Sequence, residues 1–163
     1  MNAVQEEVLF QREDDMPAAP EETPVESRNY LIFIVGDLKL GVAADYVVEI
    51  LNNYTITYLP MMPDYILGIY NMRGQIIPIL DVRRRLGKYP KENDDSLVIV
   101  LNYNGVQLGI LVDTVELMID IPNERIMPIP SQSVQKLVSG MCTLPDGAGT
   151  MLVLDCDQLM LHE

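Results

Sequence analysis

Short runs of apolar residues, separated by turn-forming residues, dominate the chain after Tyr30. The clearest pair is Leu97–Tyr103 and Val106–Val112, which flank Asn104-Gly105. Asn and Gly accept the positive φ angles of a type I′ turn, so this pattern predicts a β-hairpin with a two-residue loop. Gly36-Asp37 separates an earlier pair of runs in the same way. The pattern therefore predicts a mainly β protein.

Further runs of strand type extend this prediction along the chain. They are Tyr30–Val35, Leu38–Val42, Tyr70–Met72, Gln75–Leu80, Val115–Ile121, Ser139–Leu144 and Thr150–Leu154. Pro78 has no backbone N–H to donate, which predicts that its strand lies at a sheet edge or a bulge. Many short strands at hairpin spacing favour small closed barrels, because closure removes exposed strand edges.

The predicted helices are few and short. Ala44–Leu51 carries its apolar residues at helical spacing, which predicts a short helix. Asp81 is a suitable N-cap for a helix of one or two turns, and Gly87 is suited to end it. Asp155 is expected to cap a last helix over Gln158–Leu161.

The Arg73-Gly74 turn lies between two apolar segments and is the most informative feature of the chain. Gly74 is free to take a positive φ, so we expect a tight turn that holds the Arg73 side chain in place. An arginine at a rigid turn loses little entropy when it forms hydrogen bonds, which favours a recognition role. The alternative is a structural arginine that ties the turn to Asp81.

The formal net charge is −13, from 24 acidic and 11 basic residues. Such a charge repels phosphate groups and anionic lipids, so nucleic acid and membrane surfaces are poor candidates as partners. Many acidic residues fall in the segment from Met1 to Arg28, among prolines and alanines. They are Glu6, Glu7, Glu13, Asp14, Asp15, Glu21, Glu22 and Glu26. Residues 1–28 are therefore predicted to form a disordered acidic N-terminal tail.

The sequence offers little for catalysis or cofactor binding. Cys142 and Cys156 form no CxxC pair, and we expect them to be small buried apolar residues. The only histidine, His162, leaves no general base and no metal cluster, so no cofactor, metal or enzyme activity is predicted. No stretch is apolar enough for a signal peptide or a membrane span, which predicts a cytoplasmic protein.

A longer set of residues around Arg73 has the order and spacing of a known family motif. The set comprises Pro63, Tyr65-Ile66, Gly68, Asn71, Arg73-Gly74, Ile76-Ile77-Pro78 and Asp81. It resembles the motif of CheW-like chemotaxis adaptor domains. Val47–Ile50, Leu97–Leu101, Gly109–Asp113, Gly140 and Leu154-Asp155 also fall where that family places similar residues. The resemblance covers nearly everything from Tyr30 to Leu161.

This resemblance implies a CheW-like domain over residues 29–163, made of two intertwined five-stranded SH3-like barrels with a few short helices. It also implies a non-catalytic scaffold that couples methyl-accepting chemoreceptors to the histidine kinase CheA. In the family, the cytoplasmic receptor tip lies between the barrels and the regulatory domain of CheA binds separately. The chain has room for neither an ATP-binding domain nor a receiver domain, so the resemblance is to the adaptor. The resemblance also implies that the protein is recruited to receptor arrays.

The resemblance also implies which residues contact each partner. The receptor-binding residues would be Val47, Glu49, Ile50, Gly68, Arg73 and Gly140, and the kinase-binding residues would be Arg73, Leu97 and Val98.

Each of these roles has a structural alternative. Val47 and Ile50 are equally suited to a core, and Glu49 to a solvated position. Side chains alternate along a strand, so at most one of Leu97 and Val98 is expected to face a partner. Glycines such as Gly68 serve backbone geometry in many folds.

A different functional class remains as the alternative. Leu111–Val115 is similar to the Asp-Thr-Gly segment of retropepsin-like aspartic proteases, in which Asp113 would be the catalytic carboxylate. Val115 stands where that segment needs a glycine, and the tight loop that brings two carboxylates together is sterically unfavourable without it.

Overall fold

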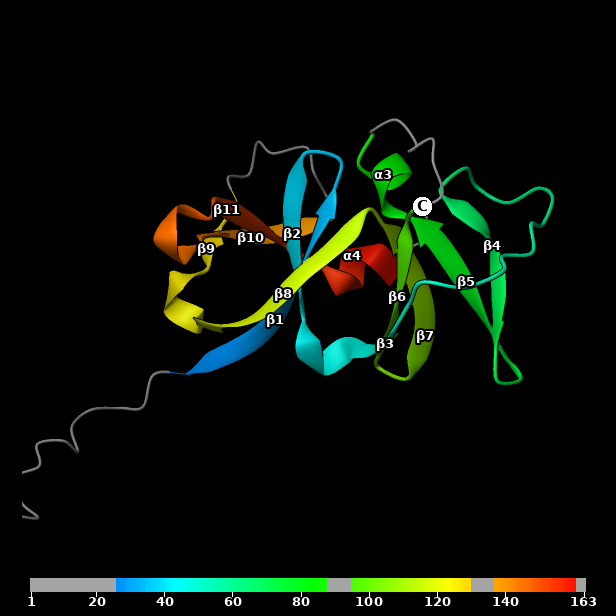
Figure 1. Cartoon of the computed structure of the whole chain (residues 1–163), viewed down its shortest axis with the longest axis horizontal. Coiled ribbons are helices and arrows are strands. Elements are labelled where there is room, and N and C mark those ends of the chain that lie inside the picture. The colour runs from blue at the N-terminus through cyan, green and yellow to red at the C-terminus, as the bar shows by residue number, and fades with distance from the viewer. Residues whose placement is uncertain (1–25, 88–94, 130–136, 161–163) are drawn as a thin grey trace, which may run out of the picture.

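The computed structural model describes residues 26–87, 95–129 and 137–160, which form two β-sheets with a few short helices (Figure 1). The first sheet has the strand order β8-β1-β2-β11-β10-β9 and the second has the order β3-β6-β7-β5-β4. The mainly β prediction is confirmed. The sixth strand of the first sheet, β9, is only two residues long.

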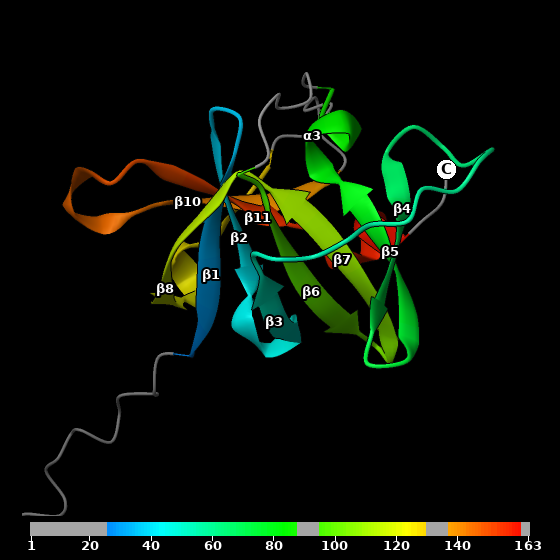
Figure 2. The same ribbon diagram turned by 45° about the vertical axis from the view of Figure 1, so that its right-hand side comes forward.

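The two ends of the described chain build the first sheet, and its middle builds the second. The first sheet contains β1 (Ser27–Val35), β2 (Leu38–Ala43), β8 (Thr114–Pro122), β9 (Met127–Pro128), β10 (Val138–Thr143) and β11 (Thr150–Leu154). The second contains β3 (Val47–Leu51), β4 (Ile66–Met72), β5 (Gln75–Asp81), β6 (Leu97–Tyr103) and β7 (Val106–Val112). Because β8 to β11 return to the sheet that β1 and β2 began, the two units are intertwined (Figures 1 and 2).

Most of the described strand pairs are antiparallel. Four of them, β1–β2, β4–β5, β6–β7 and β10–β11, are hairpins, as the turn pattern predicts. The β6–β7 hairpin turns at Asn104-Gly105, where both residues have positive φ angles. Two pairs are parallel, β2 with β11 and β5 with β7, and neither follows from local sequence signals.

The second sheet closes on itself. Its edge strands are β3 and β4, and the segment after β3 pairs with β4 through Thr57 and Ile69. Each of these two residues donates its backbone N–H to the other's carbonyl oxygen at 2.9 Å. This contact satisfies backbone groups that an open edge would leave free.

The largest hydrophobic core lies between the sheets and joins them into one domain. Phe33 and Leu40 from the first sheet pack in the same cluster as Ile99 and Ile110 from the second, together with Leu159 of the last helix. Smaller clusters fill each sheet separately. The shared core packs the two sheets against each other, and each sheet also has a smaller core of its own.

The predicted helix over Ala44–Leu51 is wrong. Ala44–Tyr46 forms one turn of 3-10 helix, η1, and the rest is strand β3, which pairs with β6. Val47, Val48 and Ile50 are β-branched and suit a strand, and the register shift between Val47 and Glu49 disturbs the simple alternation that marks a strand in sequence.

Both capped helices are present. Helix α3 (Val82–Arg85) begins after Asp81, whose carboxylate accepts the backbone N–H of Arg83 at 3.0 Å. Gly87 follows this helix with a φ of 76°. Helix α4 (Cys156–Met160) starts earlier than predicted, because Asp155 caps the N–H groups of Asp157 and Gln158.

Two remaining helical turns connect strands. Both are 3-10 helices, η2 (Asn123–Arg125) after β8 and η3 (Pro145–Gly147) between β10 and β11.

Two further expectations need correction. Strand β5 has neighbours on both sides, so the edge-strand part of the Pro78 prediction is wrong. Pro78 lies beside a register shift between β4 and β5, and β5 begins to pair with β7 only at the next residue, Ile79. Ser27 and Arg28, which the sequence assigned to the tail, pair with β8 as part of β1. The rest of the predicted tail, residues 1–25, lies outside the described residues.

Candidate interaction surface

The turn between β4 and β5 presents Arg73 as the sequence predicts. Arg73 and Gly74 have φ angles of 52° and 88°, and the pair forms the two-residue connection of the hairpin. The Asn71 side chain supports the turn by accepting the Gly74 backbone N–H at 2.8 Å. Sequence reasoning anticipated the positive φ of Gly74 but not that of Arg73, which an arginine adopts only at some cost.

The Arg73 guanidinium contacts Glu49 in β3. The Nη2 atom lies 3.1 Å from Glu49 Oε1, and the Arg73 side chain is 72% exposed. The structural alternative, a tie between Arg73 and Asp81, is wrong, because Asp81 is buried and pairs with Arg83 and Arg84. Arg73 and Glu49 are two of the six predicted receptor-binding residues, and they are in direct contact with each other.

Apolar residues that are close in sequence to the two partners of this ion pair are also exposed. Val48 and Ile50 lie beside Glu49 in β3, and Ile76 follows the turn in β5; all three are exposed. Val47, in contrast, is half-buried and packs against the large core. We call Val48, Glu49, Ile50, Arg73 and Ile76 the Arg73 surface. An exposed cation among apolar side chains has the composition of a protein-binding surface.

The two predicted glycines have structural roles. Gly68 is buried, and a Cβ atom there would lie 2.2 Å from the Thr57 carbonyl oxygen. Gly140 is buried in the first sheet, and a Cβ atom there would lie 2.8 Å from Ile126 Cγ2. Both glycines permit close backbone packing, and Gly140 is not part of the Arg73 surface.

The predicted kinase-binding pair lies in β6 and is mostly internal. Val98 is fully buried in the core of the second sheet, so it offers no surface to a partner. Leu97 is half-buried against the large core. Of the two, only Leu97 is accessible.

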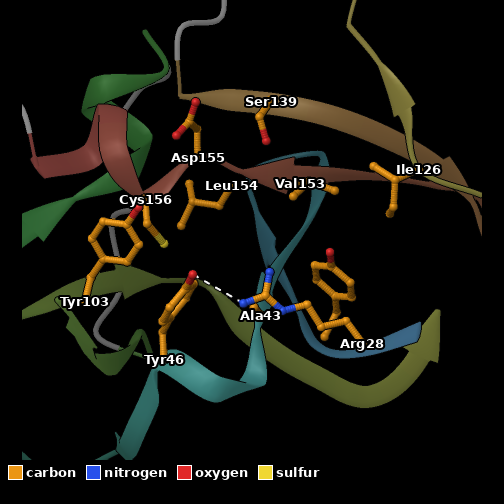
Figure 3. A pocket seen from close by; sticks show the side chains of 11 residues that line it. Arg28, Ala43, Tyr46, Tyr103, Ile126, Ser139, Val153, Leu154, Asp155 and Cys156 are labelled. Atoms are coloured by element: carbon orange, nitrogen blue, oxygen red, sulfur yellow. Dashed lines mark hydrogen bonds between the residues drawn. The ribbon is translucent and has the colours of Figure 1, made fainter. Parts of the chain in front are cut away.

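A pocket of about 250 Å³, which no sequence pattern predicted, lies between the two sheets (Figure 3). The Arg28 guanidinium donates to the Tyr46 hydroxyl at 3.3 Å and lies over the Tyr46 ring. Tyr46 in turn packs edge-on against Tyr103, with ring centroids 4.9 Å apart. Ser139 and Asp155 line the opposite wall. Arg28 was missed because its segment reads as acidic tail.

The pKa values of Tyr103 and Cys156, which line the pocket, are both raised, each for a different reason. Tyr103 donates a hydrogen bond to the Asp157 carboxylate, which raises the pKa of Tyr103 to about 12. Burial raises the pKa of the Cys156 thiol to about 11, so this thiol stays protonated at neutral pH. Cys142 and Cys156 are both free and buried, as the sequence predicts.

A buried ion network lies where the two sheets meet. Arg83 is 3% exposed; its Nε atom lies 3.3 Å from Asp81, and its Nη1 atom lies 3.1 Å from Asp113 Oδ1. The contact between Arg83 Nη1 and Asp113 Oδ1 is an ion pair whose geometry does not make it a hydrogen bond. Asp113 also accepts the Gly36 backbone N–H at 2.7 Å, from the β1–β2 turn. Asp113 therefore joins the two sheets through Arg83.

Comparison with known proteins decides the family. The model of the CheW-like domain matches residues 29–163. The chain belongs to the CheW-like domain family. It is 30% identical over 124 residues to the chemotaxis protein CheW of Helicobacter pylori, covering 75% of each chain, and 31% identical over 140 residues to that of Klebsiella aerogenes, covering 83% of each.

A solved structure shows the same fold. The crystal structure of the scaffolding protein TtCheW from Thermoanaerobacter tengcongensis matches with a TM-score of 0.73 and 27% identity, covering 79% of this chain and 89% of that one. The CheW-like resemblance read from the motif around Arg73 is confirmed. The retropepsin-like alternative finds no support, because these matches point elsewhere and Asp113 is held in the Arg83 network.

Among the described residues, no helix is both long and apolar enough to cross a membrane.

Proposed function

We propose that this CheW-like domain is a non-catalytic scaffold that couples methyl-accepting chemoreceptors to the histidine kinase CheA. The observation that carries the proposal is the exposed Arg73 at the turn of the family motif, in contact with Glu49. The relatives are chemotaxis proteins and a scaffolding protein by name, which supports a coupling role. On this proposal the protein works in the cytoplasm and is recruited to receptor arrays.

The receptor tip is proposed to bind along a continuous path from the pocket to the Arg73 surface. Tyr46 lines the pocket and directly precedes β3, which carries Glu49 and Ile50. A helical hairpin lying on this path would contact apolar side chains in β3 and the guanidinium of Arg73 at its end. Gly68 and Gly140 would support the path through backbone packing and make no contact themselves.

The regulatory domain of CheA is proposed to dock beside this path. Arg73 is exposed enough to contact either partner, and Leu97 is the accessible member of the predicted kinase-binding pair. Val98 is left out of the proposed contact because it is fully buried.

The test is calorimetric titration of the full chain with the regulatory domain of its own organism's CheA, and separately with a soluble fragment of a receptor tip. We expect binding to both, at dissociation constants of tens of micromolar or tighter. Ile50→Asp should weaken receptor binding, whereas Met118→Asp, on an exposed position of β8 in the other sheet, should not. No measurable heat with either partner would contradict the proposal.

A further inference from the structure

The described chain passes between the two sheets at two points. The first is the turn η1 (Ala44–Tyr46), which leads from β2 to β3, and the second is the single residue Asp113 between β7 and β8. Figure 2 shows the second passage where the two sheets meet. Because this passage is only one residue long, the contacts of Asp113 bear directly on how the sheets sit relative to each other.

Asp113 contacts both sheets. Its backbone N–H donates to the Ile34 carbonyl oxygen at 2.9 Å, and its Oδ2 atom accepts the Gly36 backbone N–H at 2.7 Å. Both partners belong to the β1–β2 hairpin of the first sheet. Its Oδ1 atom lies 3.1 Å from Nη1 of Arg83, in the helix that directly follows β5. One carboxylate thus holds a turn of the first sheet with one oxygen and a helix of the second unit with the other.

The Arg83 guanidinium is itself held in place. Its Nε atom lies 3.3 Å from Asp81 Oδ1, and the same carboxylate oxygen accepts the Arg83 backbone N–H at 3.0 Å. Asp81 is the last residue of β5 and pairs in register with Leu111 of β7. The side chains of Arg83 and Asp113 are only 4% and 16% exposed. The position of the cation is therefore fixed from the second sheet, and Asp113 meets it there.

A buried network of this kind contributes more to a unique arrangement than to net stability. Taking the charges out of water costs free energy that their attraction only roughly offsets, although removing one partner alone is costly. The core between the sheets is apolar, and apolar contacts have no preferred direction, so cores lose uniqueness before they lose stability. An ion pair of fixed geometry forms in one arrangement of the sheets and is broken in the others.

The proposed receptor path depends on that arrangement, whereas the proposed kinase contact does not. The path begins at the pocket, whose wall includes Arg28 and Val153 of the first sheet and Tyr103 of the second. Arg73 and Leu97, which are proposed to face CheA, both belong to the second sheet unit. A shift of one sheet against the other would therefore change the receptor path and leave the kinase contact intact.

We propose that Asp113 is a positioning residue for receptor binding. Through Arg83 it fixes the two sheets in the arrangement that the receptor tip recognises, and it touches neither partner itself. This inference rests on the proposed coupling function and adds to it the residue that sets the shape of the receptor path. It also gives Asp113 a role that is electrostatic and internal.

Two variants and a matched control test the proposal. Asp113→Asn keeps an oxygen for the Gly36 N–H but removes the charge that pairs with Arg83. Arg83→Lys keeps the buried charge, but an ammonium lacks the fixed fork of nitrogens with which the guanidinium reaches two carboxylates. Glu116→Gln is the control, because it neutralises a carboxylate of β8 whose partner, Lys39, lies in the same sheet.

The first measurement is the distance between the sheets. Spin labels on Val106→Cys in β7 and Met118→Cys in β8 occupy exposed positions on different sheets, and the native cysteines are buried. Pulsed electron paramagnetic resonance should give one narrow distance distribution for the doubly labelled chain and for its Glu116→Gln variant. Asp113→Asn and Arg83→Lys should each broaden or shift the distribution.

The second measurement compares the affinities for the two partners. Asp113→Asn should weaken binding of a soluble receptor-tip fragment by about fivefold or more, because only molecules in the matching arrangement bind. Its affinity for the regulatory domain of CheA should not change. A variant that was merely less folded would lose both affinities in the same proportion, so the difference between the partners separates positioning from stability.

Four results would overturn the proposal. They are unchanged distances in both variants, changed distances with normal receptor affinity, equal losses for receptor and CheA, and a network that cannot be altered without unfolding the chain. The last two would leave Asp113 a purely structural role. If the unaltered chain bound neither partner, the coupling function itself would be contradicted, and the distances would still decide whether Asp113 fixes the sheets.

Discussion

Arg73 and Glu49 join the two edges of the second sheet through a 3.1 Å ion pair. Arg73 belongs to the β4–β5 turn and Glu49 to β3, and these strands lie at opposite ends of the strand order. The contact is possible only because the sheet closes, as the Thr57–Ile69 pair also shows. Closure therefore places a cation from one edge beside a carboxylate from the other, on an exposed surface.

Arg73→Ala should keep the fold and uncouple receptor control of the kinase. The ion pair is largely exposed, so its loss should change the free energy of unfolding by less than about 1 kcal/mol. Thermal unfolding checks the first part, and a reconstituted assay of receptor-controlled kinase activity checks the second. Arg73→Lys keeps the charge but loses the planar guanidinium, and it should be intermediate. An unfolded Arg73→Ala variant, or one that couples normally, would assign Arg73 a structural role instead.

Arg83→Ala should be strongly destabilising, whereas Arg84→Ala should not. Removing Arg83 leaves Asp81 and Asp113 in a buried site without their cation, which should cost about 3–5 kcal/mol. Arg84, the next residue of the same helix, makes only a 3.7 Å contact to Asp81 from an exposed position, and its loss should cost less than about 1 kcal/mol. Urea unfolding of both variants measures the difference. Equal losses would show that the Arg83 network does not join the sheets.

Gly68→Ala should destabilise the protein more than Gly74→Ala. At Gly68 the new Cβ would collide with the Thr57 carbonyl oxygen and break the pair that closes the second sheet, at a cost of about 3 kcal/mol. At Gly74 no atom lies within 4 Å, and only the positive φ is unfavourable, at about 1–2 kcal/mol. Chemical unfolding compares the two. If Gly68→Ala were fully stable yet failed to bind receptor, Gly68 would be a contact residue after all.

Tyr103 should make the stability depend on pH in the alkaline range. Its hydrogen bond to Asp157 raises its pKa to about 12, above the value of about 10 for an unfolded tyrosine. The folded state thus favours the protonated phenol, so the contribution is complete below about pH 10 and is lost as the pH rises toward 12. The free energies of unfolding of the wild type and of Tyr103→Phe, measured at increasing alkaline pH, should become equal over this range.

A spectroscopic titration tests the same pair directly. Asp157→Asn removes the carboxylate charge and should lower the Tyr103 midpoint, followed by tyrosinate absorbance, toward about 10. A midpoint that does not move would show that Asp157 is not the cause.

Local sequence signals identified most strands and both capped helices. The β6–β7 hairpin matches its predicted bounds because Asn104-Gly105 encodes a turn that needs no tertiary help. Asp81 and Asp155 cap helices because a carboxylate can accept N–H groups two or three residues ahead in the chain. β3 was misread because its register shift disturbs the alternation on which strand prediction relies.

The candidate site was predictable only in part. The family motif drew attention to Arg73 and Glu49, which the structure brings into contact with each other, while their role in receptor binding stays a prediction. It could not show that Val98, Gly68 and Gly140 are buried, because burial depends on strands that come from elsewhere in the chain. Arg28 was missed because its segment has the composition of an acidic tail, and the pocket beside Tyr46 was missed because its walls come from distant parts of the chain.

Four features follow from the order of the amino acids alone: the hairpins, the helix caps, the tight Arg73-Gly74 turn and the family. Each depends on residues close together in the chain or on a fixed spacing. Three others depend on how distant segments pack: the parallel pairing of β2 with β11, the closure that brings Arg73 to Glu49, and the Arg83 network between the sheets. These features are contacts between residues far apart in the chain, and such contacts form only when the shared core packs.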